Sequence, residues 1–326
     1  MLAAVATVAF LVAGCGQAYL PSASNSSAKS GAGVVSRAVS PSVGTAPALA
    51  APLPLLGASD TSSVEVLHNV DFARPPECGA ADCSVQLDIF IPAGTGPFRT
   101  VVLVRGGPTG PGGRGYVAPF AEQLAAAGLI VFSADMRDTA ATGGGYPEAF
   151  EDVACAIRYA RTWSPQYGGD GNSVTLVGHS LGGYVGSVVA LDPTEFEGGC
   201  LAGGSGRPDA FVGLSGNYDL TAPSVANDLV KFFGGSPEET FDTRTASDPF
   251  NYAAATPIPV RLVAGTADTT VPPIAATELD AYLTNLGWDV DLTLVPDGTH
   301  QSILNATDQG ATSVRAVLEA TQAAGT

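Results

Sequence analysis

The feature that most constrains the fold of this 326-residue chain is an alternation of short apolar runs with longer helix-like segments, from about residue 100 onward. A strand that is apolar at every position is buried on both faces, which is typical of parallel sheets. Gaps of ten or more residues leave room for the helical crossovers that parallel strands need. The alternation therefore predicts an α/β fold around the strands Val101–Val104, Leu129–Ser133, Ser173–Val177, Ala210–Leu214, Pro259–Ala264 and Val290–Val295.

Two earlier segments, Val64–Asn69 and Ser84–Ile91, alternate apolar and polar residues as half-buried antiparallel strands do. They bring the expected sheet to eight strands, mostly parallel, within a domain spanning residues 61–326. The segment from Leu220 to Ile258 is too short for a cap domain, and we expect one helix and a long loop there to wall a pocket. The expected helices are Ala118–Ala127, Pro147–Trp163, Leu181–Leu191, Val225–Phe233, Pro273–Leu286 and Ser302–Thr321.

The charge balance is strongly acidic, with 14 Lys and Arg against 31 Asp and Glu and a net charge of −17. Such a surface repels phosphate backbones, which argues against nucleic acid as a partner. The 45% of hydrophobic residues is typical of a packed domain rather than of a disordered chain.

The first 14 residues carry no charge and are almost wholly apolar, as in the hydrophobic region of a signal peptide. Val12-Ala13-Gly14-Cys15 then resembles a bacterial lipobox, which predicts that Cys15 becomes the lipidated N-terminus. The alternative is an ordinary cleavage site and a freely secreted protein. Residues 15–60 are rich in Ser, Ala, Gly and Pro, and we expect a flexible tether there. The protein is thus expected to be exported, and to meet a membrane only through the lipid anchor.

Four cysteines remain besides Cys15, an even number in a chain expected to be exported. Cys78 and Cys83 lie close together and form the natural local pair, which leaves Cys155 with Cys200. Metal binding at these cysteines is not supported, because the chain has no CxxC spacing and no histidine beside them.

One motif carries most of the functional information, the sequence Gly178-His179-Ser180-Leu181-Gly182 between a buried strand and a helix. This is G-x-S-x-G in the strand–turn–helix setting that lifts a nucleophilic serine above a sheet. Ser180 is the predicted nucleophile, and the Leu181 N–H at the helix start is a predicted oxyanion donor. The His179 side chain is expected to point away from the side of Ser180 where the base lies.

A serine nucleophile needs a base, and the chain has only three histidines. His68 lies in an early strand and His179 lies inside the motif. His300 follows the last strand. When a serine nucleophile lies in a G-x-S-x-G turn, the acid and then the histidine base come later in the chain, which favours His300 as the base.

The acid that orients the imidazole should follow a late strand. Asp268 comes just after Pro259–Ala264 and is the first choice, while Asp219, after the preceding strand, is the second. Asp297 is expected only to shape a turn. A second oxyanion donor should come from the loop after Val101–Val104, where the Gly107 N–H is available and Pro108 has none.

The stretch from about Thr100 to Leu304 resembles α/β-hydrolases of the carboxylesterase and feruloyl-esterase-like group, which are related to dienelactone-hydrolase-like enzymes. Arg105 departs from the histidine that the family usually carries there. The resemblance implies hydrolysis of small-molecule carboxylic esters through an acyl-enzyme, with no metal or organic cofactor. The resemblance rests on these residues and motifs, in chain order: Gly106-Gly107, Tyr146-Pro147, Asp152, Asp170, the Ser180 motif, Asp268-Thr269-Thr270-Val271-Pro272-Pro273 and Gly298-Thr299-His300.

Other functions stay open on the same residues. A lipase, a polyesterase or a peptidase could use this fold, although the absence of a long lid insertion disfavours a lipase for large triglycerides. A binding lipoprotein without catalysis is the remaining alternative, and the complete Ser180, Asp268 and His300 set argues against it. The sequence leaves the acyl and alcohol specificity and the oligomeric state undetermined.

Overall fold

The computed structural model describes residues 35–37, 63–76, 84–107, 113–140, 143–252 and 256–325. The predicted signal peptide, Cys15, and the Cys78–Cys83 pair lie outside the described residues, as does most of the predicted tether. These expectations therefore remain predictions. Within the described part, no helix has both the length and the apolar character needed to cross a membrane.

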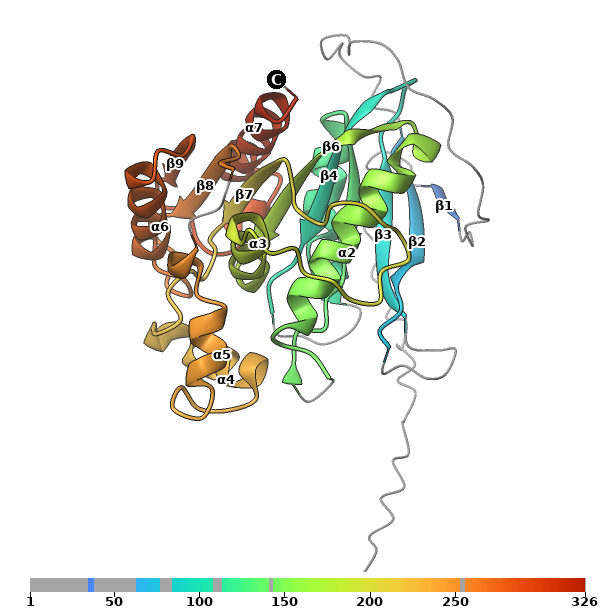
Figure 1. Ribbon diagram of the computed structural model, residues 1–326. Coiled ribbons are helices and arrows are strands. Elements are labelled where there is room, and N and C mark those ends of the chain that lie inside the picture. Colours follow the sequence, from blue (N-terminus) through green and yellow to red (C-terminus); the bar gives the residue numbers. More distant parts are fainter. Residues whose placement is uncertain are drawn as a thin grey trace, which may run out of the picture. The chain divides into compact units, whose positions relative to one another are not determined.

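The described strands form one sheet in the order β1-β2-β3-β5-β4-β6-β7-β8-β9 (Figure 1). The pairs from β5 through β4 and β6 to β9 are all parallel, whereas β3 is antiparallel to both β2 and β5. All eight predicted strands are present, and β1 adds a short ninth strand parallel to β2. The bounds are β1 Val35–Arg37, β2 Glu65–Ala73, β3 Val85–Ile91, β4 Phe98–Val104, β5 Leu129–Ala134, β6 Gly169–His179, β7 Ala210–Leu214, β8 Val260–Gly265 and β9 Val290–Val295.

Helices cover both faces of the sheet, which explains the continuous apolar runs. In β4, Val101 and Leu103 belong to the core cluster shared with α1 and α7, while Val102 and Val104 belong to the cluster shared with α2, α3 and α6. Successive strand residues point to opposite faces, so a sheet buried twice needs apolar residues at every position. The helices are α1 Ala118–Ala126, α2 Glu148–Trp163, α3 Leu181–Leu191, α4 Ala226–Phe233, α5 Phe241–Ala246, α6 Ile274–Asn285 and α7 Asp308–Ala323.

The segment between β7 and β8 differs from the prediction. One helix and a long loop were expected there, and the structure has α5 as a second helix after α4 (Figure 1). With only six residues, α5 is too short to show a helical apolar period in the sequence.

The predicted disulfide between Cys155 and Cys200 is present, with the two Cα atoms 4.9 Å apart. It joins the middle of α2 to the loop that follows α3. The two cysteines are 45 positions apart in the sequence, so the bridge closes a long loop.

Candidate active site

Ser180 lies at a tight turn between β6 and α3, with φ +55° and ψ −120°. This region is unfavourable for a residue with a Cβ, so the turn must be held by its surroundings. The Ser180 N–H donates to the Leu214 carbonyl at 3.0 Å, and the Ser180 carbonyl accepts from Tyr184 and Asn217. A Cβ on Gly182 would lie 2.4 Å from the Arg105 carbonyl oxygen, so the motif requires glycine there.

The predicted acid and base are in direct contact. His300 Nδ1 lies 2.8 Å from Asp268 Oδ2, and the Asp268 carboxyl group is fully buried. The other carboxylate oxygen, Oδ1, accepts the N–H groups of Thr270 and Val271, each at 2.9 Å. Burial opposes ionisation of Asp268, but hydrogen bonds from His300 and the Val271 N–H outweigh it and hold its pKa below the ordinary value. An ionised Asp268 therefore fixes the proton of His300 on Nδ1.

The two other acidic residues considered from the sequence have local partners instead. Asp219 Oδ1 accepts the N–H and the hydroxyl of Thr221, as in a turn closed by an aspartate side chain. Asp297 has φ +53°, and its N–H donates to the Thr266 hydroxyl. Neither aspartate is among the hydrogen-bond partners that the described residues give His300, so Asp268 is the acid that the geometry supports.

Ser180 and His300 line one cavity of about 250 Å³, together with Gly106, Gly107, Tyr116, His179, Asp228, Thr270 and Gln301. Among the described hydrogen bonds there is none between the Ser180 and His300 side chains, and such bonds often tighten only when substrate binds. The two N–H groups predicted to stabilise the oxyanion lie near this cavity or next to Ser180. Gly107 lines the cavity, and Leu181 is the first residue of α3, where N–H groups have no partner within the helix.

The expectation for His179 is wrong. Its side chain is buried beside the base rather than turned away from it, with the His179 and His300 ring centroids 4.6 Å apart. His179 Nε2 lies 3.0 Å from the His300 carbonyl oxygen. Burial, reinforced by repulsion from a charged His300, lowers the pKa of His179 to about 3. His179 is therefore neutral and can donate its Nε2–H to that carbonyl, which holds the loop of the base.

Three cavity residues were not identified from the sequence. Tyr116 follows β4 by a loop, Asp228 lies in α4, and Gln301 follows the base. The Tyr116 hydroxyl donates to the Gln301 side chain and so joins two walls of the cavity. No local pattern marks these residues, because they come from separate elements that meet only in the folded chain.

A family model described as BD-FAE matches residues 87–283, which is more than half of the chain. Esterase LipC of Mycobacterium tuberculosis is 33% identical over 131 residues, which are 38% of this chain and 31% of that protein. A probable isoprenylcysteine alpha-carbonyl methylesterase of Arabidopsis thaliana is 27% identical over 139 residues, which are 41% of this chain and 29% of the relative. The chain thus spans about a third of the length of these curated relatives.

Among solved structures, a truncated form of a carbohydrate esterase from gut microbiota is similar, with a TM-score of 0.66 and 21% identity. The match covers 83% of this chain and all of that one. At this identity the likeness concerns the fold, and together with the strand order it confirms the predicted α/β-hydrolase architecture.

Proposed function

The chain belongs to the BD-FAE family, and from this premise and the site geometry we propose that it is a serine hydrolase of carboxylic esters. The observation that carries the proposal is the buried Asp268–His300 pair beside the cavity that Ser180 enters from its turn. The esterase names of the curated relatives support the same reaction class.

Each residue has a defined role in the proposed reaction. Ser180 Oγ attacks the ester carbonyl carbon while His300 Nε2 accepts its proton, and Asp268 stabilises the imidazolium. The carbonyl oxygen becomes an oxyanion that accepts hydrogen bonds from the Gly107 and Leu181 N–H groups. The carbon–oxygen bond to the alcohol then breaks, and His300 returns the proton to the departing oxygen. Water then attacks the carbonyl carbon of the acyl-enzyme while His300 accepts its proton. The bond from that carbon to Ser180 Oγ breaks, His300 returns the proton to Oγ, and the carboxylic acid leaves.

The size of the cavity supports small ester substrates. About 250 Å³ accommodates a short acyl group or a single small ring, and Tyr116, which lines the cavity, is 45% exposed to solvent. We therefore expect a short acyl chain, with the alcohol part left largely outside. Polyester and peptide substrates remain the alternatives that a substrate panel should include.

The proposed setting is outside the cytoplasm. The uncharged apolar start and the sequence before Cys15 support export, and the Cys155–Cys200 disulfide supports an oxidising compartment. We propose anchoring through lipid on Cys15, and mass spectrometry of the mature N-terminal peptide tests this. A diacylglyceryl mass on Cys15 supports the anchor, whereas a free N-terminus at another residue means simple secretion.

The main test combines turnover with active-site labelling. Ser180→Ala should reduce hydrolysis of p-nitrophenyl acetate to less than about a thousandth of wild type. It should also abolish labelling by a fluorophosphonate, with thermal unfolding unchanged. Ser187→Ala is a matched control, because Ser187 is a buried serine in α3 whose hydroxyl donates to the Tyr184 carbonyl. Equal activity in wild type and Ser180→Ala would reject the serine mechanism.

A further inference from the structure

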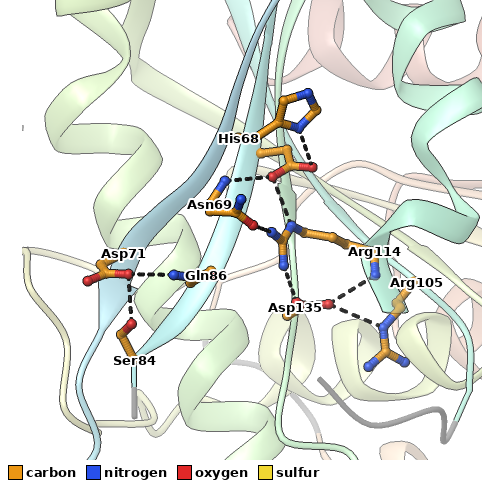
Figure 2. Close-up of polar contacts among 9 residues, drawn as sticks. His68, Asn69, Asp71, Ser84, Gln86, Arg105, Arg114 and Asp135 are labelled. Carbon is orange, nitrogen blue, oxygen red and sulfur yellow. Dashed lines mark hydrogen bonds and ion pairs between the residues drawn. The ribbon is translucent and has the colours of Figure 1, made fainter. Parts of the chain in front are cut away.

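A connected group of buried charged side chains leads from Asp88 in β3 through Arg114 and Asp135 to Arg105, next to Gly106 and Gly107 (Figure 2). At its centre is Asp135, which directly follows β5 and is 5% exposed. Its Oδ1 accepts the Arg114 N–H at 2.9 Å and lies 3.5 Å from Arg105 Nε, while Oδ2 pairs with Arg114 Nη1. We call Asp135, Arg105 and Arg114 the Asp135 clamp. One carboxylate therefore contacts Arg105, just after β4, and Arg114, two positions before Tyr116.

Arg105 connects the clamp to the proposed oxyanion donor. Its side chain is completely buried, and Nη1 donates both to Asp138 Oδ2 at 2.7 Å and to the Gly106 carbonyl oxygen at 2.8 Å. The Gly106 carbonyl and the Gly107 N–H belong to one planar trans peptide, so they point in opposite directions. A hydrogen bond that fixes the Gly106 carbonyl therefore also fixes the direction of the Gly107 N–H.

The same peptide lies directly against the nucleophile. A Cβ on Gly106 would come within 2.8 Å of the Ser180 Cβ, and Gly107 lines the cavity with Ser180. A glycine also suits Gly107, which has φ +147°. A small rotation of this peptide would consequently move the donor relative to the carbon that Ser180 attacks.

Arg114 connects Asp135 to β2 and β3. Its Nε lies 3.0 Å from Asp88 Oδ1, and its Nη2 donates to Asn69 Oδ1 at 2.5 Å (Figure 2). Asp88 also binds His68 Nδ1 at 3.1 Å. Tyr116, two positions after Arg114, is a wall of the cavity. The clamp thus places both the proposed donor and one wall.

The cost of burying these charges argues for a role other than stability. Two guanidinium groups and the carboxylates of Asp88, Asp135 and Asp138 are removed from water, and their mutual attraction only partly offsets that cost. Buried ion pairs can often be replaced by apolar residues without loss of stability, but they hold groups in one geometry. An oxyanion donor needs such preorganisation.

We propose that Asp135 is a positioning residue for catalysis, which acts through Arg105 to direct the Gly107 N–H at the oxyanion of the transition state. The inference rests on the proposed ester hydrolysis. It assigns to Asp135 an effect on the tetrahedral state and none on ground-state binding.

The first test is Asp135→Asn, which keeps an acceptor for the Arg114 N–H and removes the negative charge 3.5 Å from Arg105 Nε, while Asp138 stays in place. We expect kcat for p-nitrophenyl acetate to fall about ten- to a hundred-fold, somewhat less than the loss of a whole oxyanion donor. KM should stay within about two-fold. Affinity for an alkylboronic acid, which forms a tetrahedral adduct with Ser180, should fall in parallel with kcat/KM.

The matched control is Asp209→Asn. Asp209 directly precedes β7 and so lies at the amino end of a strand, whereas Asp135 lies at the carboxyl end of β5. Asp209 Oδ2 accepts hydrogen bonds from Arg161 Nη2 and from the Val174 N–H, each at 2.8 Å. Like Asp135→Asn, this substitution removes a negative charge beside an arginine and keeps an acceptor for a backbone N–H, here that of Val174. The kcat, the KM and the boronate affinity of Asp209→Asn should therefore match wild type. If Asp135→Asn fails to fold, Arg105→Lys takes its place, because a lysine cannot bind Asp138, Asp135 and the Gly106 carbonyl together.

The outcomes separate this inference from the proposed function. Equal activity of wild type and Ser180→Ala would reject the function itself. An active wild type and an inactive Ser180→Ala, with folded Asp135→Asn showing unchanged kcat and boronate affinity, would overturn only the positioning role. A raised KM at constant kcat would overturn it as well, since that result assigns Asp135 to ground-state binding.

Discussion

The Asp268→Asn substitution gives the sharpest test of the assigned triad. In the structure Asp268 Oδ1 accepts two backbone N–H groups, from Thr270 and Val271, and Oδ2 faces His300 Nδ1. An asparagine must keep its carbonyl oxygen toward the two N–H donors, because its NH₂ group there would meet them unfavourably. The NH₂ group then faces His300 and donates to Nδ1.

This orientation forces the wrong tautomer on the base. With Nδ1 as acceptor, the His300 proton lies on Nε2, which can no longer accept the proton of Ser180. We expect kcat to fall about 10⁴-fold, which corresponds to about 5.5 kcal/mol of transition-state stabilisation. Folding should be largely preserved, because both backbone hydrogen bonds survive.

The assay is steady-state hydrolysis of p-nitrophenyl acetate, with thermal unfolding measured on the same preparations. Asp219→Asn is the control, since Asp219 only closes a turn with Thr221, and its kcat should stay within about two-fold of wild type. A loss below ten-fold in folded Asp268→Asn would refute the tautomer argument. A larger loss in Asp219→Asn would move the acid to Asp219.

Three further predictions concern stability. The pKa of Asp268 is lower in the folded protein than the ordinary value near 4. The ionised carboxylate should therefore stabilise the fold above about pH 4, and this contribution should be lost as the pH falls through the folded pKa. The free energies of unfolding of wild type and Asp268→Asn, measured against pH, should converge at that low pH. Replacing Cys155 and Cys200 by serine should cost about 4 kcal/mol for a closed loop of 45 residues, and denaturant titration measures it. Gly182→Ala should unfold or inactivate the protein because its Cβ meets the Arg105 carbonyl, whereas Gly203→Ala, with open space around it, should not change the melting temperature.

Local pattern was sufficient to predict the sheet and to select the proposed reacting residues. Continuous apolar runs predicted six of the eight main strands, because a doubly buried strand shows its burial in consecutive residues, and alternating apolar and polar residues predicted β2 and β3. Ser180 was identified from five consecutive positions between a strand and a helix. His300 and Asp268 followed from chain order after the last strands, and the structure brings these two into contact.

The choice between Asp268 and Asp219 needed the folded chain. Each follows a buried strand, and the sequence alone does not show which carboxylate reaches the imidazole. The contact with His300 decides for Asp268, and the turn with Thr221 accounts for Asp219. The wrong expectation for His179 has the same origin, since its direction depends on where the His300 loop returns.

The sequence by itself determined the strands, the turn at Ser180 and the order of the proposed triad residues, because these depend on neighbours within a few residues. Only the tertiary structure decided which loops meet at the cavity. β4 lies between β5 and β6 in the sheet, so the loop after β4 can reach Asp135 on one side and Ser180 on the other. The Asp135 clamp depends on that strand order. A local period in the sequence does not reveal strand order, because it indicates which face of the sheet a residue occupies and not which strand lies beside it.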